Sequence, residues 1–494
     1  MRGEGQWLVC FDTDRIKQYL LATNRLEEIR GGSALIADLD KKRKCGLESR
    51  YGQQRVVYSA GGGAAVLVPT EQEARSLIAE IEREFRAATV TASITGACVW
   101  TDTSPGRFGA EMSRAGRELR RAKAAKAELA SVPIEPYMRL CSSCGQHPAA
   151  HQAQDGSGDW LCQACQKKRE LGRRERKGFF YEFIEWAAEP TVWEEEELPK
   201  DLDAIGSVSS PPGYVGFIAL DGNQIGDLLS KPATVEAYRA FSEGLWGLTK
   251  EQTFAALKKY GLPRNGIAPF EIILIGGDDV LLITAADMAV EVALAIAEGF
   301  EAQSSRQVLS PAGLSDERKK LTMAGGVVLA HADFPIPAMY ALAEALQKSA
   351  KRLCAEQGYE TGAIDFQVVS GSDTDLDMLR AAIPHHRPYP LAELRKLLYY
   401  IRQFKAAGFP TSQLQAMYQA LFEGEVNAQL ASIATLGYLG RSADKTRYNR
   451  LKAFFKDFGV QFEGQLPPWD ANKRSALADL VELYPFISAK GEAE

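Results

Sequence analysis

The chain has 494 residues, of which 46% are hydrophobic and 25% charged, and its formal net charge is −6 at pH 7. This composition is ordinary for globular domains, and the negative charge excludes a global basic field that would attract nucleic acid. The length predicts about three domains, and no apolar run approaches the roughly 18 residues that indicate a membrane span. The N-terminus, MRGEGQWLVCFDTDR, carries charges where a signal peptide has its apolar region, so we expect a cytoplasmic protein.

The first half begins with a predicted strand, WLVCFDTD, that leads into a helix. A predicted hairpin follows at RVVYSAGGGAAVLVP, and then a helix, a strand and a helix with basic residues. The order β-α-β-β-α-β is the ferredoxin-like pattern. At the end of the first strand, Asp12 and Asp14 could hold a metal ion weakly, or Asp14 could cap a helix that begins at Arg15.

Two CxxC pairs follow the first unit, with 17 residues between them. This spacing predicts a zinc ribbon. Four thiolates fill a tetrahedral coordination sphere and leave no position for water, so we expect a structural zinc ion. The expected ligands are Cys141, Cys144, Cys162 and Cys165. The loop between the pairs holds His147 and His151, which we interpret as bystanders unless one replaces a cysteine.

Two segments are strongly basic. Residues 167–177, KKRELGRRERK, carry seven basic and two acidic residues. We expect any RNA contact on this stretch or on the basic helix of the first half, with a solvated basic face as the alternative. The cations of that helix are Arg114, Arg117, Arg120, Arg121, Lys123 and Lys126. Residues 189–212 are acidic, then small and proline-terminated, which predicts a linker.

The second half repeats the order of the first. The strand in VGFIALDGNQIGDLL ends at Asp221, and the predicted hairpin FEIILIGGDDVLLIT carries Asp278 and Asp279 at its turn. In the ferredoxin-like topology these positions are adjacent, so we expect the three carboxylates to meet. Neighbouring carboxylates repel unless a cation lies between them, and oxygen ligands suit Mg²⁺ or Mn²⁺. An acidic surface turn is the alternative.

The last segment, residues 373–494, has helical periodicity with tyrosines, phenylalanines and basic residues. Such stripes form either the core of a small helical bundle or an interaction surface. Within this segment PHHRP, residues 384–388, predicts a loop, with a metal site as the alternative.

Taken in order, these motifs resemble the large polymerase-like subunit of type III CRISPR effector complexes. The GGDD motif is also similar to the turn of diguanylate cyclases, but Val280 and Leu281 stand where glutamate and phenylalanine follow there. The collinear set is more specific and covers nearly the whole chain. Besides the ribbon, it comprises FDTDRIKQYLLATNRLEEIRGGSALIADLD, YSAGGGAAVLVP, DGNQIGDLL, IGGDDVLLI, GGVVLAHADFPIPAMYALAEALQKSAKR and RPYPLAELRKLL.

The resemblance implies an α+β fold in which two ferredoxin-like palm domains face each other, with a zinc ribbon between them in sequence and a C-terminal helical domain. The first palm is degenerate, because Gly61, Gly62 and Gly63 stand where GGDD would be. The expected boundaries are 1–139 for the first palm, 140–178 for the ribbon, 179–212 for a linker, 213–372 for the second palm and 373–494 for the helical domain.

The resemblance also implies the activity. Each palm would hold an ATP, and the second palm would join ATP through 3′–5′ phosphodiester bonds into cyclic oligoadenylates, second messengers in antiviral defence, with release of pyrophosphate. Asp221 and Asp278 would be ligands of Mg²⁺ or Mn²⁺. Asp279 would hold a second ion or take the proton from a 3′-hydroxyl.

Further residues are expected at the nucleotides. In the second palm these are Gly276, Gly277, Asn223 and Lys351. Lys351 matches a lysine that contacts the triphosphate in related cyclases, although it could be a solvated helix lysine. In the first palm the expected residues are Arg30, Ser33 and Gly62. The stretch RGGSA, residues 30–34, would either cradle a nucleotide with its backbone amides or form a plain helix-start turn.

The implied partners are ATP, guide RNA and target RNA, and other type III subunits that include a small helical one; stand-alone or homo-oligomeric action is the alternative, and no membrane is involved. No histidine precedes the first palm, so we expect a short form without an HD nuclease domain. Two other functions stay open: a cyclic dinucleotide synthase, and a catalytically silent RNA-binding scaffold.

Overall fold

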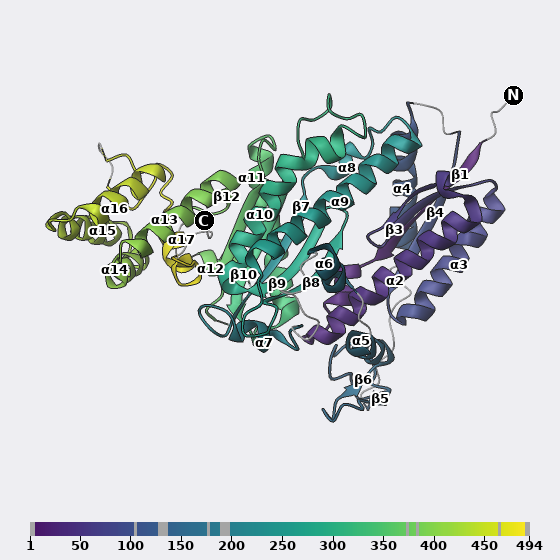
Figure 1. The fold of residues 1–494 in the computed structure, drawn as a ribbon, viewed down its shortest axis with the longest axis horizontal. Helices are drawn as coiled ribbons and strands as arrows, with labels where there is room; N and C mark the ends of the chain where they lie inside the picture. Colours follow the sequence, from purple (N-terminus) through teal and green to yellow (C-terminus); the bar gives the residue numbers. More distant parts are fainter. Residues whose placement is uncertain are drawn as a thin grey trace.

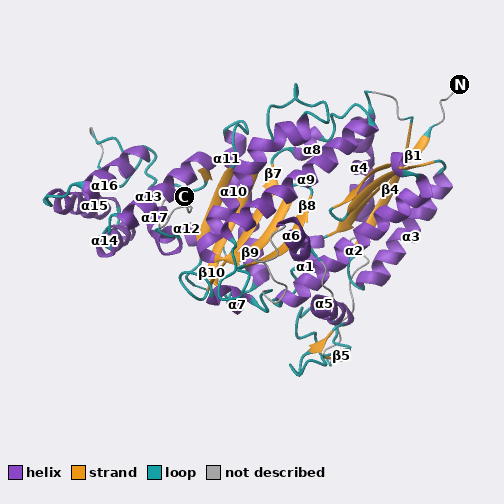
Figure 2. Cartoon of the chain, in the orientation of Figure 1, coloured by secondary structure: helices purple, strands orange, loops and turns teal. Residues whose placement is uncertain are grey.

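The computed structural model describes residues 5–102, 106–126, 137–174, 178–187, 198–371, 375–381, 385–462 and 466–489. Two sheets lie side by side, each with helices packed against it (Figure 2). The cysteine-bearing module lies to one side of the first sheet, and the C-terminal helices form the far end of the molecule (Figure 1). The expected α+β architecture is confirmed.

The first palm is a four-stranded antiparallel sheet in the order β2-β3-β1-β4, the ferredoxin-like arrangement. Helix α3 is amphipathic, and Thr70 caps it by accepting a hydrogen bond from the amide of Glu73. The strands are β1 (Gln6–Asp14), β2 (Val56–Ala60), β3 (Gly63–Val68) and β4 (Ser93–Thr101). The helices are α1 (Ile16–Leu20), α2 (Leu26–Tyr51), the 3₁₀ turn Gln53–Arg55, α3 (Glu71–Thr89) and α4 (Phe108–Lys126).

The second palm has the same core order, β10-β7-β9-β8, extended by β11, which runs parallel to β10, and by β12. Its strands are almost wholly buried, and α10 and α11 both pack on β7 and β10. The strands are β7 (Tyr214–Gly222), β8 (Phe270–Gly276), β9 (Asp279–Ala285), β10 (Met323–His331), β11 (Ala363–Val368) and β12 (Tyr389–Pro390). The helices are α8 (Ile225–Leu228), α9 (Val235–Tyr260), α10 (Ala286–Ser304), the π-helix Ser305–Leu309 and α11 (Ile336–Glu356).

The segment expected to be a linker contains two helices that pack on the second palm. In α6 (Phe179–Ala187), the ring of Phe183 lies 5.5 Å from that of Phe254 and 5.4 Å from that of Phe270. The second helix, α7 (Leu202–Ser207), contacts β7 and β9. The linker interpretation is therefore wrong for 179–187 and 198–212, because buried aromatic and aliphatic side chains fix them to the sheet. Residues 188–197 lie outside the described ranges.

The cysteine-bearing module comprises β5 (His151–Gln152), β6 (Trp160–Leu161) and α5 (Gln163–Arg174), and α5 packs along α2. The two helices approach so closely that a Cβ atom on Gly31 would lie 1.8 Å from the carbonyl oxygen of Lys168. A Cβ atom on Gly172 would lie equally close to the carbonyl of Glu27. RGGSA is therefore not a helix start, and its backbone amides do not cradle a nucleotide, because it lies inside α2. Its glycines permit the helix–helix contact.

The structure also corrects the prediction that residues 167–177 present a basic face for RNA. Lys168 is buried, with its ammonium 3.7 Å from the centre of the Tyr19 ring, and it donates to the Tyr19 carbonyl. Arg169 is buried and donates to Glu28, Asp155 and Asp159. These cations hold the module against α2, so they are not free for RNA. Residues 175–177 lie outside the described ranges.

The basic helix α4 is largely neutralised by neighbouring acids. Within the helix, Arg114 pairs with Glu111 and Arg121 pairs with Glu118. Its last two lysines pair with acids of other elements: Lys123 with Asp12 and Lys126 with Glu82. Exposed pairs of this kind are weak, but they reduce the net positive charge that α4 would offer to phosphates.

The C-terminal segment is a helical bundle built on aromatic side chains, with the rings of Phe404 and Phe409 stacked at 4.7 Å. It comprises α12 (Leu376–Arg380), α13 (Leu391–Ala406), α14 (Thr411–Phe422), α15 (Glu425–Gly440), α16 (Thr446–Asp457), α17 (Ala476–Leu483) and the 3₁₀ turn Tyr484–Phe486. His385 and His386 lie at its junction with the second palm, where the buried carboxylate of Asp479 accepts the amide of His386 and the hydroxyl of Tyr389. None of the helices in the described ranges has the length and apolar character that a membrane crossing requires.

The two palms are joined through their hairpins and long helices. A Cβ atom on Gly61 would lie 3.4 Å from Cα of Gly276, so the two hairpin turns touch. Arg30 of α2 lies across the interface, where it contacts both carboxylate oxygens of Glu271 on β8, with Nε at 3.3 and 3.1 Å. It also donates to the carbonyl of Pro199. Arg30 is therefore an interface residue rather than the expected nucleotide contact.

We expect Glu271→Ala to destabilise the protein by about 3 kcal/mol, because it leaves the guanidinium of Arg30 buried without its counter-charge. Glu271 is 2% exposed and Arg30 13% exposed at their side chains. The measurement is the midpoint of denaturant unfolding. The matched control is Glu71→Ala, which removes the exposed partner of Arg75 on α3 and should cost less than about 1 kcal/mol. Equal effects of the two changes would contradict the prediction.

Candidate active site

The GGDD turn is a two-residue hairpin connection between β8 and β9. Gly276 pairs with Asp279, so Gly277 and Asp278 form the turn, and Gly277 has a φ of 63° that favours glycine. Leu220 of β7 pairs with Val280 of β9, so the next residues, Asp221 and Asp279, are neighbours across the ladder. The register thus brings all three predicted acids to one end of the sheet.

Asp278 bends back over the end of β7. A Cβ atom on Gly222 would lie 2.7 Å from Oδ2 of Asp278, so only glycine leaves room for this carboxylate. Burial and the neighbouring charge of Asp279 raise the pKa of Asp278 to about 7, against the opposing effect of Lys17. The surrounding cations and hydrogen-bond donors of the protein therefore do not fully stabilise the negative charge of Asp278.

Two lysines contact the other two acids. Lys351 of α11 donates to Asp221, and Lys17 of α1 donates to Asp279, with Nζ 2.9 Å from Oδ1. Because the lysines bind these oxygens, the three carboxylates do not converge on one point. Among the described residues, only the four cysteines bring three or more potential metal ligands within 4.8 Å of one another. The acids lie at one edge of the sheet and offer only oxygen ligands. Such ligands suit Mg²⁺ or Mn²⁺, which would displace the lysines from the carboxylates.

Asn223 is expected to contact the nucleotide, but in the structure it hydrogen-bonds to Thr322 at the end of the second-palm sheet. Its side-chain amide donates to Oγ1 of Thr322 at 3.0 Å, and its backbone amide donates to the Thr322 carbonyl. Arg318 covers the same segment, since its guanidinium donates to the Asn223 carbonyl and to Gln224. This network fixes the backbone directly after Asp221.

The first palm has the same turn without the acids. Ala60 pairs with Gly63, so Gly61 and Gly62 form the connection, and Asp12 pairs with Gly63. Asp12 is therefore the counterpart of Asp221, and its partner Lys123 corresponds to Lys351. Gly62 and Gly63 replace Asp278 and Asp279. One carboxylate and its lysine remain, and the turn carboxylates are absent.

Asp14 does not cap a helix, so that interpretation is wrong. Helix α1 begins at Ile16 after Arg15 in a left-handed conformation, and no side chain caps it. Asp14 instead accepts hydrogen bonds from the hydroxyls of Ser93 and Thr95 on β4. Nζ of Lys123 lies 3.3 Å from Asp14 and 2.6 Å from Asp12, in the position that a weakly held cation would take.

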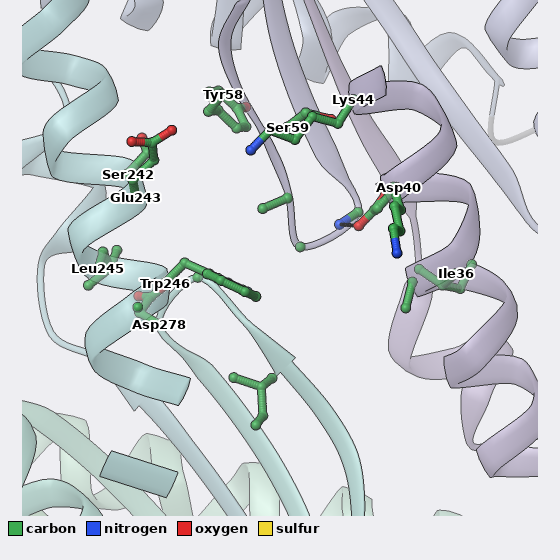
Figure 3. A pocket seen from close by; sticks show the side chains of 18 of the residues that line it. Ile36, Asp40, Lys44, Tyr58, Ser59, Ser242, Glu243, Leu245, Trp246 and Asp278 are labelled. Atoms are coloured by element: carbon green, nitrogen blue, oxygen red, sulfur yellow. Dashed lines mark hydrogen bonds between the residues drawn. The ribbon is translucent and has the colours of Figure 1, made fainter. Parts of the chain in front are cut away.

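A cavity of about 770 Å³ lies between the palms, within the range of small-molecule sites. Figure 3 shows α2 on one side, with Asp40 and Lys44, and α9 on the other, from which Trp246 extends into the opening. Of the predicted residues, the lining includes Ser33, Gly62, Gly277 and Asp278. The lining does not include Asp221, Asp279, Arg30, Asn223, Gly276 or Lys351. Sequence reasoning missed Trp246, because no local motif marks α9, and it missed Lys17.

The four cysteines form the second candidate site. Their sulfur atoms all lie within 4.8 Å of one another, and Sγ of Cys144 is 3.9 Å from Sγ of Cys162. These separations fit a tetrahedral ion bound at about 2.3 Å from each sulfur, as in structural zinc sites. His147 and His151 are not part of the cluster.

Residues 214–357 match the family model described as Cas10/Cmr2, second palm domain. The matched segment contains all three acids and Lys351. The chain is similar to Cas10/Cmr2 proteins over this segment. No curated protein matches it.

Solved structures resemble the chain over nearly its whole length. A crystal structure of Csm1 in T. onnurineus has a TM-score of 0.59 at 14% identity, covering 97% of this chain and 70% of that one. A Csm1–Csm4 cassette in complex with one ATP has a TM-score of 0.58 at 14% identity, covering 99% and 70%. The cassette in complex with cA4 has a TM-score of 0.56 at 14% identity, covering 99% and 70%. These likenesses establish the fold of the chain.

The cysteine cluster predicts about one zinc ion per purified chain by elemental analysis. Cys162→Ser should lower the yield of folded protein, because the ribbon loses a ligand and α5 loses its anchor on α2. Cys45→Ser, at an exposed cysteine of α2 outside the cluster, is the control and should leave the yield unchanged. A well-folded protein free of zinc would contradict the assignment.

The raised pKa of Asp278 predicts a pH-dependent stability. An aspartate ordinarily titrates near 4, so the folded protein holds the Asp278 proton more tightly than the unfolded chain does. Asp278 therefore costs stability increasingly as pH rises from about 4, and the cost is complete above about 7.

Without divalent metal, Asp278→Asn should raise the melting temperature by roughly 2 °C or more at pH 8 and have little effect at pH 4. Mn²⁺ should stabilise the parent at pH 8 more than it stabilises the variant. Thermal melts at the two pH values test this, and a variant that is less stable than the parent at pH 8 would refute it.

Proposed function

We propose that the chain is a metal-dependent nucleotidyltransferase that joins ATP through 3′–5′ phosphodiester bonds into cyclic oligoadenylates, with release of pyrophosphate, in CRISPR-type antiviral defence. The observation that supports this most directly is the placement of Asp221, Asp278 and Asp279 at one end of the second-palm sheet, beside a cavity between the two palms. One of these acids, Asp278, lines the cavity itself.

The proposed roles follow from the chemistry of the side chains. Asp221, Asp278 and Asp279 would hold Mg²⁺ or Mn²⁺, which when bound lower the pKa of an attacking hydroxyl and offset charge on the phosphates. Asp279 would otherwise take the proton of the 3′-hydroxyl. Lys351, beside Asp221, would contact the triphosphate once released from that carboxylate.

The first palm would bind a second ATP without catalysing its reaction. Ser33 and Gly62 line the cavity on that side, and Gly62 and Gly63 offer no carboxylates for a metal ion. Two ATP molecules facing each other would place the 3′-hydroxyl of one near the triphosphate of the other, which lowers the entropic cost of the reaction.

The solved structures support the choice of substrate and setting. The Csm1–Csm4 cassettes were obtained in complex with AMPPNP, pppApA, cA3 and cA4. By this likeness we propose ATP as the substrate. For partners we propose subunits of a type III complex, including a Csm4-type subunit, with guide and target RNA controlling the activity.

The double change Asp278→Ala and Asp279→Ala should lower nucleotide polymerisation roughly a thousandfold or more, since each 1.36 kcal/mol of lost transition-state stabilisation is tenfold in rate. The fold should tolerate it, because the apolar flanks of the hairpin remain and two repelling carboxylates are gone. The assay is incubation with each nucleoside triphosphate and Mn²⁺ or Mg²⁺, followed by mass analysis of the products. The control is Asp333→Ala, at an exposed acid beyond β10.

The outcomes separate the alternatives. Cyclic trimers or larger rings from ATP support the proposal, and cyclic dinucleotides point to the other class of synthase. Product formation by the double variant at the parent rate would refute the site. A parent that converts no nucleotide, with or without partner subunits and target RNA, would indicate a silent scaffold.

A further inference from the structure

Lys17 belongs to the first palm, but its side chain contacts the candidate catalytic turn of the second. Its ammonium lies 2.9 Å from Oδ1 of Asp279, and the two side chains are 25% and 28% exposed. Helix α1 is anchored by its buried residues Tyr19 and Leu20. Lys17 is thus presented by a fixed element, and its side chain is partly exposed, so an incoming ligand can reach it.

The position of Lys17 follows from the contact between the two hairpin turns. A Cβ atom on Gly62 would lie 3.4 Å from Cδ1 of Ile16, so α1 rests on the turn of its own palm. That turn touches Gly276 and Gly277 of the second palm. The contact between the palms therefore determines the distance between Lys17 and Asp279.

The internal repeat provides a comparison within the molecule. Lys17 is the fifth residue after Asp12, and the fifth residue after the counterpart Asp221 is Gly226. A Cβ atom on Gly226 would have no neighbour within 4 Å, so the position has room for a side chain. The first palm, which faces the acidic turn of the second, has a lysine at this position. The second palm, which faces the all-glycine turn of the first, has a glycine there. Within this chain the lysine therefore occurs only opposite the acidic turn.

A simple ion pair does not account for the whole arrangement. Lys17 and Lys351 flank the acids from opposite palms. Their carboxylate partners, Asp279 and Asp221, are neighbours across the β7–β9 ladder, so the two ammonium groups approach the same acidic edge. Two mutually repelling cations around an acidic edge are suited to a polyanion that replaces the carboxylates as their partner.

We propose that Lys17 is a catalytic residue that the first palm supplies to the second, where it contacts the β- and γ-phosphates of the bound triphosphate. The inference rests on the proposed function. In that reaction the 3′-hydroxyl oxygen attacks the α-phosphorus, the bond from the α-phosphorus to the bridging oxygen breaks, and pyrophosphate leaves with the electron pair. The hydroxyl proton passes to a base. Lys17 offsets the charge that develops on the pyrophosphate.

One consequence is that turnover requires the two palms in contact. A lysine supplied across an interface acts as the arginine finger of other phosphoryl-transfer enzymes does, because separation of the two bodies removes it from the phosphates. Any partner that changes the spacing of the palms would change the rate through this side chain without touching the acids.

The test compares Lys17→Gln with Lys42→Gln. Lys42 is a lysine of the same palm that pairs with Asp38 within α2 and does not line the cavity. At saturating ATP and Mn²⁺ we expect Lys17→Gln to lower kcat roughly 10- to 100-fold. Lys42→Gln should stay within about twofold of the parent, and Lys17→Arg should retain part of the rate because it keeps the charge. Thermal melts verify that each variant is folded.

A second readout separates a catalytic lysine from one that only neutralises Asp279. If Lys17 merely competes with metal, Lys17→Gln should lower the Mn²⁺ concentration for half-maximal rate and leave kcat unchanged. That result would overturn the proposal.

Binding measurements keep the inference testable if the parent makes no product. With Mn²⁺, Lys17→Gln should weaken AMPPNP binding about tenfold and leave AMP binding unchanged, because only AMPPNP carries β- and γ-phosphates. Loss of affinity for AMPPNP alone in a silent parent would refute the proposed function and support the lysine contact. Equal effects on both ligands, or none, would refute the contact itself.

Discussion

The backbone contact between two glycine turns, at Gly61 and Gly276, is the constraint on which the functional site depends. Each turn requires a left-handed residue, with a φ of 63° at both Gly61 and Gly277, and glycine adopts this conformation without strain. Because neither turn carries a bulky side chain at the contact, the palms approach closely enough to enclose one cavity. The Arg30–Glu271 pair and the Lys17–Asp279 pair both depend on this approach.

The two palms share a scaffold but meet different electrostatic demands. Both keep a strand-end aspartate paired with a lysine from the helix that follows β4 or β10. In the first palm Asp40 of α2 accepts the amide of Gly62 at 2.6 Å, so the protein itself stabilises the turn. In the second palm Asp278 occupies that turn with its pKa raised to about 7. The acidic turn therefore lacks the stabilising contact that the protein gives to the all-glycine turn.

The sequence predicted those features that rest on local patterns. Alternation and turn residues located both hairpins, and cysteine spacing located the ribbon, because each depends on neighbours in the chain. The errors arose where distant segments pack. Gly31 meets Gly172 between two helices, and Arg169 is buried by acids from other segments, so neither serves as a binding surface. Lys17 was missed for the same reason, since its partner is 262 residues away.

The ribbon bears on the active site although it lies away from the acids. Its helix α5 packs against α2, whose Ser33 and Asp40 line the cavity. Lys168 of α5 also donates to the carbonyl of Tyr19, which lies on α1 two residues from Lys17. A metal ion that orders the ribbon therefore stabilises one wall of the cavity and the helix that presents Lys17. A metal ion at the cysteines would affect the acids through these two helices, since none of the cysteines in the described ranges lines the cavity.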